Sequence, residues 1–155
     1  MQQRYFRFVR FGIVLSSLLA VACGDGEDDV GGKAKSCPAV ADDGIEITGD
    51  WVSNFGGTES IDSTTWGEAA VTEFDNDENF AVTQNADDAE FSPGLFNRLV
   101  WTERDPDDDC SFYYCWVSIG RDSAADARDS DDTADASDPE TTGCGGFPWT
   151  KLTPE

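Results

Sequence analysis

The acidic segment near the C-terminus has the residue spacing that comes nearest to a metal site. Positions 1, 3, 5, 7 and 12 of a loop of the EF-hand kind are matched by Asp129, Asp131, Thr133, Asp135 and Glu140. Oxygen ligands with that spacing can surround Ca²⁺. However, Ala134 stands where such loops use glycine for their sharp turn, and no apolar helices flank the segment. We therefore favour a solvated acidic loop and expect no cofactor, with calcium binding as the alternative.

Catalytic chemistry is limited by the absence of histidine from the chain. Ser–His–Asp catalysis, Cys–His catalysis and histidine metal ligands are thereby excluded. No glycine-rich phosphate loop stands between an expected strand and an expected helix. Carboxylates number 32, so no pair stands out as the acid and base of a glycosidase or aspartic protease. We expect a protein that is not an enzyme.

The five cysteines of the chain indicate whether disulfides form, and therefore whether the protein is exported to an oxidising compartment. If Cys23 is used separately, an even number remains: Cys37, Cys110, Cys115 and Cys144. Two disulfides are the expected state in an oxidising space, and four cysteines allow three pairings. Of these we choose Cys115 with Cys144 and Cys37 with Cys110. A zinc site is the alternative, but no CxxC pair or histidine supports it.

The N-terminus has the pattern of an export signal. Arg4, Arg7 and Arg10 precede an apolar run over 13–22, which is shorter than the ~20 residues of a membrane-spanning helix. The run ends Leu-Ala-Val-Ala-Cys, which resembles the bacterial lipobox. The resemblance implies cleavage after Ala22 and acylation of Cys23 with diacylglycerol and a fatty acid such as palmitate. An ordinary secretory signal is the alternative.

An acylated Cys23 would make the membrane the first partner of this protein, since two or more acyl chains anchor a protein stably. Gly24 follows the anchor, where Asp commonly retains lipoproteins at the inner membrane, so we favour the outer membrane. Cleavage would leave 133 residues with 7 basic and 32 acidic side chains, a net charge of −25. That balance argues against nucleic acid and against direct binding of anionic lipid.

The remainder of the chain predicts one small all-β domain. We expect a signal peptide over 1–22, a lipidated cysteine and flexible tether over 23–44, and a β domain over 45–155 with an acidic loop over 121–142. Alternating apolar residues and turn clusters predict strands near 45–51, 58–62, 69–74, 78–84, 97–104, 111–119 and 147–152. About six to eight such strands, stapled by disulfides, would form a small antiparallel barrel or sandwich.

Tryptophans are distributed over several of these expected strands. Most such aromatic sets build a core, which is the interpretation we favour. They could instead line a ligand cavity, for which the candidates are Trp51, Trp101, Trp116 and Trp149.

Residues 47–61, ITGDWVSNFGGTESI, resemble the opening hairpin of avidin-like barrels and share the Gly-x-Trp of lipocalins. The resemblance implies a closed antiparallel barrel that holds a small ligand, with Trp51 plugging one end. The biotin-contact positions of avidins fall on Ser53, Phe55 and Gly57, which do not match, so biotin binding is not implied. The whole chain also resembles small acidic Gram-negative lipoproteins of unassigned function.

Two functions are consistent with these patterns. The first is a non-enzymatic, lipid-anchored interaction, adhesion or structural domain whose partner is an unknown envelope protein. The second is a carrier that holds a small apolar ligand in its barrel. A filled barrel interior would favour the first function, and a hollow interior would favour the second.

Overall fold

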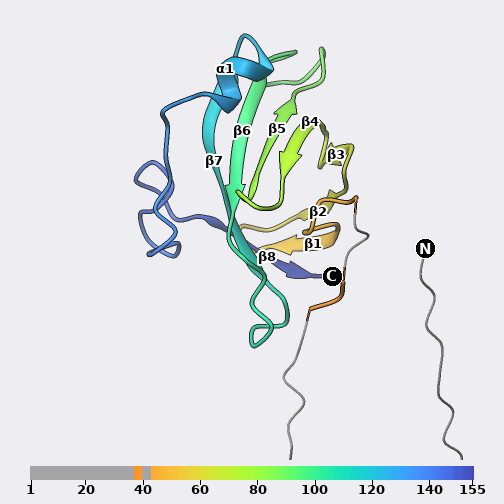
Figure 1. The fold of residues 1–155 in the computed structure, drawn as a ribbon, viewed down its shortest axis with the longest axis vertical. Helices are drawn as coiled ribbons and strands as arrows, with labels where there is room; N and C mark the ends of the chain where they lie inside the picture. Colours follow the sequence, from red (N-terminus) through yellow and green to blue (C-terminus); the bar gives the residue numbers. More distant parts are fainter. Residues whose placement is uncertain (1–36, 40–42) are drawn as a thin grey trace, which may run out of the picture. The chain divides into compact units, whose positions relative to one another are not determined.

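Eight antiparallel strands form a closed barrel in which each strand pairs with the next and β8 pairs with β1 (Figure 1). The strands are β1 Gly49–Ser53, β2 Thr58–Ile61, β3 Thr65–Trp66, β4 Ala69–Asp75, β5 Phe80–Gln84, β6 Phe96–Trp101, β7 Phe112–Arg121 and β8 Thr150–Pro154. A short helix, α1 Ala124–Arg128, follows β7. The predicted small antiparallel β domain is therefore confirmed, and of the two expected architectures the chain adopts the barrel.

The computed structural model describes residues 37–39 and 43–155. The described residues lie within one unit, Lys33–Glu155, which contains all the described strands, α1 and both disulfides. The expected signal peptide, its cleavage site at Ala22 and the anchor Cys23 lie outside the described residues. Within the described part, no helix has both the length and the apolar character needed to cross a membrane.

Alternation of apolar and polar residues explains why these segments form barrel strands. In β6, Leu99 and Trp101 belong to the interior cluster, whereas Phe96 and Val100 pack against the outside. A period of two residues is what places alternate side chains on opposite faces of a strand. The interior is filled by eleven buried side chains in contact, namely Ile45, Ile47, Trp51, Ile61, Trp66, Ala81, Leu99, Trp101, Phe112, Tyr114 and Leu152.

One end of the barrel is closed by the chain that precedes β1. We predicted a strand from residue 45, but residues 45–48 form a turn in which Thr48 donates its backbone N–H to the Ile45 carbonyl. This turn buries Ile45 and Ile47 completely, so the apolar alternation that suggested a strand serves to cap the barrel. Asn76 fixes the cap, because its side chain bonds the Gly44 carbonyl and the Glu46 N–H.

Disulfides join Cys37 to Cys110 and Cys115 to Cys144, which are the predicted pairs. The first attaches residues 37–39 to the loop between β6 and β7, at the closed end. Residues 37–39 and 43–44, which we assigned to the C-terminal part of the tether, lie within the unit Lys33–Glu155. The second disulfide holds the chain between β7 and β8 against the outside of β7.

The acidic segment 121–142, which we predicted to be a solvated loop, contains the short helix α1 and makes an apolar contact with the barrel. Within α1, Ala127 is buried against Phe80 and Val82 on the outer face of β5. Ser123 caps the helix by accepting the Asp126 N–H, and the remaining segment follows the outside of the barrel. β7 is therefore covered on both faces, which accounts for its largely apolar sequence.

Candidate functional site

A cavity of about 770 Å³ opens at the end of the barrel opposite the cap. It is bordered by the turn between β3 and β4, by the loop 85–91 that follows β5, and by β7. We call this cavity the mouth. Residues 37–39 lie at the other end of the molecule, beside the loop 102–111 that follows β6, whereas the mouth lies at the end where β6 begins (Figure 1).

Aromatic side chains provide much of the wall of the mouth. Trp66 comes from β3, Trp116 from β7 and Phe91 from the loop after β5. Trp66 is buried and Trp116 is half-buried, while Phe91 is 77% exposed. Small residues, Ala69, Ala86 and Ala89, form the surface between them and leave the space open.

An interior carboxylate fixes the aromatic residues below the mouth. Glu59 accepts a hydrogen bond from Trp66 Nε1 at 2.8 Å and another from the Tyr114 hydroxyl at 2.5 Å. Burial, followed by the charge of Glu59, raises the pKa of Tyr114 far above its usual range. Tyr114 also packs edge-on against both tryptophans of the mouth, with ring centroids 5.2 Å from Trp66 and 6.3 Å from Trp116. This network holds the tryptophans in place before any ligand arrives.

The mouth also carries three acidic side chains, Glu68, Asp88 and Glu90, and none of the basic residues that the structure describes lines it. Among the described contacts, none of the three carboxylates has a hydrogen bond or an ion pair. Every basic residue of the described chain has its partner elsewhere: Arg98 at Ser130, Arg104 at Pro38, Arg121 at Asp132, Arg128 at Glu73 and Lys151 at Asp108. The mouth therefore combines apolar walls with uncompensated negative charge.

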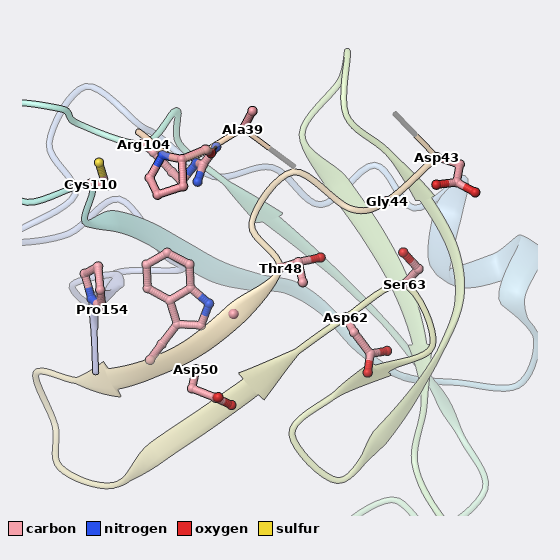
Figure 2. A pocket seen from close by; sticks show the side chains of 13 residues that line it. Ala39, Asp43, Gly44, Thr48, Asp50, Asp62, Ser63, Arg104, Cys110 and Pro154 are labelled. Atoms are coloured by element: carbon pink, nitrogen blue, oxygen red, sulfur yellow. Dashed lines mark hydrogen bonds between the residues drawn. The ribbon is translucent and has the colours of Figure 1, made fainter. Parts of the chain in front are cut away.

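A second cavity of about 610 Å³ lies at the closed end (Figure 2). Asp43, Asp50 and Asp62 line it from three different segments, as Figure 2 shows. Hydrogen bonds from Thr64 hold the pKa of the Asp62 carboxyl below its ordinary value. Pro38, Ala39 and Asp43 border this cavity on both sides of residues 40–42, which are not described. We therefore assign no site to it.

The four tryptophans proposed as cavity residues are separated in the structure. Trp51 is buried at the cap, where its Nε1 donates a hydrogen bond to the Ile47 carbonyl. Trp101 is buried in the filled interior and donates to Glu46 at 2.6 Å. Trp149 lies outside the barrel, where it borders a cavity of about 500 Å³ beneath the segment 130–136. Only Trp116 of the four borders the mouth.

Trp66 borders the mouth but was not among those four candidates. Its strand, β3, has two residues and follows the polar turn 62–64, so no alternation could reveal it. A tight turn joins Trp66 at the end of β3 to Ala69 at the start of β4. Gly67 in this turn has a φ of +57°, which favours glycine. That turn was the available signal for a short hairpin.

The residues of the calcium hypothesis are dispersed and bonded to other groups. Asp129 pairs with Arg128 at 2.9 Å, Asp135 accepts from Ser137, and Glu140 accepts from Tyr113. Asp131 and Thr133 border the cavity next to Trp149. Across the described residues, no three His, Cys, Asp or Glu side chains are placed to hold a metal ion.

Comparisons with protein-family models, with curated proteins and with solved structures find no match to this chain. Function must therefore be argued from the geometry of the mouth.

Proposed function

We propose that this protein is an exported, lipid-anchored binding domain of the bacterial envelope that takes a small molecule at the mouth of its barrel. The mouth carries the proposal, because a concave site with apolar walls and a few polar groups is typical of small-molecule sites. Its volume of about 770 Å³ lies within the range of ~300–1,000 Å³ that such sites have. No catalytic step is proposed.

The filled interior limits how deeply a ligand can enter. Trp51, Trp101 and Phe112 occupy the barrel below the mouth and are at most 4% exposed. A ligand would therefore rest against Trp116 and Phe91, above the buried Trp66, rather than lie along the barrel axis. The proposed mode is a shallow binding site, unlike the deep cavity of a carrier that encloses its ligand.

The described chain begins at the closed end of the barrel. Residues 37–39 are held at that end by Cys110 and by Arg104, which donates to the Pro38 carbonyl at 2.9 Å. The outer membrane remains our proposed location.

A protein partner, the function first expected from the sequence, is the second candidate, and the filled interior favours it over a carrier that encloses its ligand. Phe55 and Phe147 are 66% and 73% exposed and do not line the mouth. If a partner docks there, the F55S/F147S variant would lose a partner that co-purifies from the envelope. Retention of that partner would contradict this candidate.

Binding at the mouth can be tested with residues 24–155, which contain the whole barrel unit. The protein would be exported to a bacterial periplasm so that both disulfides form, and titrated with the neutral fluorescent probe N-phenyl-1-naphthylamine. The A89W variant places a large side chain in the mouth, so we expect it to lose most of the fluorescence increase. The control A125W lies on the exposed side of α1 and should bind normally. Equal binding by A89W and the unchanged protein would contradict the proposal.

A further inference from the structure

We propose that the mouth selects an organic cation, that is, a small molecule that carries an amine or a quaternary ammonium group. This inference rests on the proposed function and names its ligand class. Three features of the mouth support it independently: its aromatic walls, its unpaired carboxylates and the charge beneath it.

The aromatic walls offer faces that attract a cation. A positive group within ~6 Å of the centre of a tryptophan, tyrosine or phenylalanine ring is attracted by the electrons of the ring face, most strongly by tryptophan. Trp116 of β7 and Phe91 of the loop after β5 present partly exposed rings to the cavity, whereas Trp66 lines it as a buried side chain that is 2% exposed. Because Glu59 and Tyr114 already hold Trp66, little side-chain entropy is lost when a ligand binds.

The carboxylates select for charge. Glu68, Asp88 and Glu90 line the mouth without a basic neighbour and without a described hydrogen-bond partner. A positive ligand would supply the missing counter-charge, whereas an anion would be repelled. An inorganic cation fits less well, because the described residues contain no group of three carboxylates that converges on one point. Carboxylates that are spread around aromatic rings fit an organic cation better, because its positive charge is distributed over several atoms.

The third feature is the carboxylate of Glu59, which lies below the aromatic residues of the mouth. Glu59 faces the barrel interior and accepts from Trp66 and Tyr114, which are neutral donors. No described lysine or arginine forms an ion pair with it. Its negative charge therefore remains uncompensated, and its field reaches the mouth through a medium of lower dielectric than water. The chain's net charge of −22 adds a long-range attraction for cations.

The test uses choline and its neutral isostere, 3,3-dimethylbutan-1-ol, which have the same shape and differ in the charged nitrogen. Both would be titrated into residues 24–155 by calorimetry, at low and at physiological salt. We expect choline to bind at least about tenfold more tightly at low salt, which corresponds to ~1.4 kcal/mol, and to lose part of that advantage as salt rises. Equal affinities for the two compounds would overturn the inference.

Matched variants assign the selectivity to the mouth. E68Q/D88N/E90Q removes its three charges, and we expect choline to bind about tenfold more weakly while the alcohol is unaffected. D77N/D107N/E155Q makes the same change in net charge on residues that do not line the mouth and should change the choline affinity less than about threefold. An equal loss in both triple variants would overturn the inference, because the charge effect would then not belong to the mouth.

The outcome also separates this inference from the proposed function. If N-phenyl-1-naphthylamine binds and A89W blocks it, but choline binds no better than its isostere, the ligand class is wrong and the binding mouth stands. If neither the fluorescent probe nor choline binds, the proposed function itself fails.

Discussion

Replacement of Glu59 by glutamine should weaken the barrel directly beneath the mouth. The carboxylate of Glu59 accepts from both Trp66 Nε1 and the Tyr114 hydroxyl. A glutamine side chain keeps one acceptor oxygen at most for these two donors and presents an NH₂ group to the other. One buried donor would thus lose its charged acceptor.

The size of the effect follows from that lost bond. A hydrogen bond to a charged group contributes ~1.5–3 kcal/mol, and Tyr114 is only 5% exposed, so water cannot easily replace the acceptor. We expect E59Q to lower the free energy of unfolding by about 2 kcal/mol. With a urea dependence of ~1–3 kcal/mol per molar, the unfolding midpoint would fall by roughly 1 M.

Urea unfolding followed by tryptophan fluorescence measures this change, and E68Q is the matched control. Glu68 is exposed and has no described partner, so its replacement should change the free energy of unfolding by less than ~0.5 kcal/mol. A second readout is the alkaline absorbance titration of tyrosine. E59Q should lower the pKa of Tyr114 toward its ordinary value without reaching it, since burial, the larger cause of the shift, remains. Unchanged unfolding together with an unchanged Tyr114 titration would refute the network.

Three further predictions concern the rest of the barrel. The C115S/C144S variant should lose about 3–4 kcal/mol in denaturant unfolding, because its disulfide closes a loop of 29 residues; a loss below ~1 kcal/mol would contradict this entropic account. G143A should lose ~1–3 kcal/mol, also by denaturant unfolding, since its Cβ would lie 2.0 Å from the Asp135 carbonyl oxygen; unchanged stability would show that the close approach is absent. The raised pKa of Tyr114 means that its stabilising contribution is complete below pH ~10 and is lost as the pH rises beyond that value; urea midpoints should therefore fall more steeply with alkaline pH in the unchanged protein than in Y114F, and parallel curves would exclude Tyr114 as the cause.

Strands with a clear alternation could be predicted from the sequence. β6 and β7 lie where we predicted strands, near residues 97–104 and 111–119. The largely apolar sequence of β7 fits its position, because both of its faces are covered. The closure of the barrel could not be predicted, because pairing between β1 and β8 joins segments about a hundred residues apart and alternation says nothing about partners. At residues 45–48 the same pattern gave a wrong strand, since a turn can bury Ile45 and Ile47 equally well.

The candidate site was less predictable than the fold. Trp116 was among the predicted cavity residues, but the sequence could not show that Trp51 and Trp101 fill the interior or that Trp149 lies outside it. Those differences depend on which end of a strand and which face each residue occupies, and register sets both. The feature that we propose to be selective is a group of three acidic residues with no basic neighbour among the described residues. It depends on distances between loops, which no spacing along the chain encodes.

The most direct test of the central claim is to follow the five tryptophan indole N–H signals by NMR while choline is added to residues 24–155. Single tryptophan-to-phenylalanine variants would assign the signals. We predict that Trp116 and Trp66 shift in a saturable manner, while the signals of Trp51, Trp101 and Trp149 stay in place. A saturable shift of Trp51 without movement of Trp116 would place binding at the closed end and contradict the account.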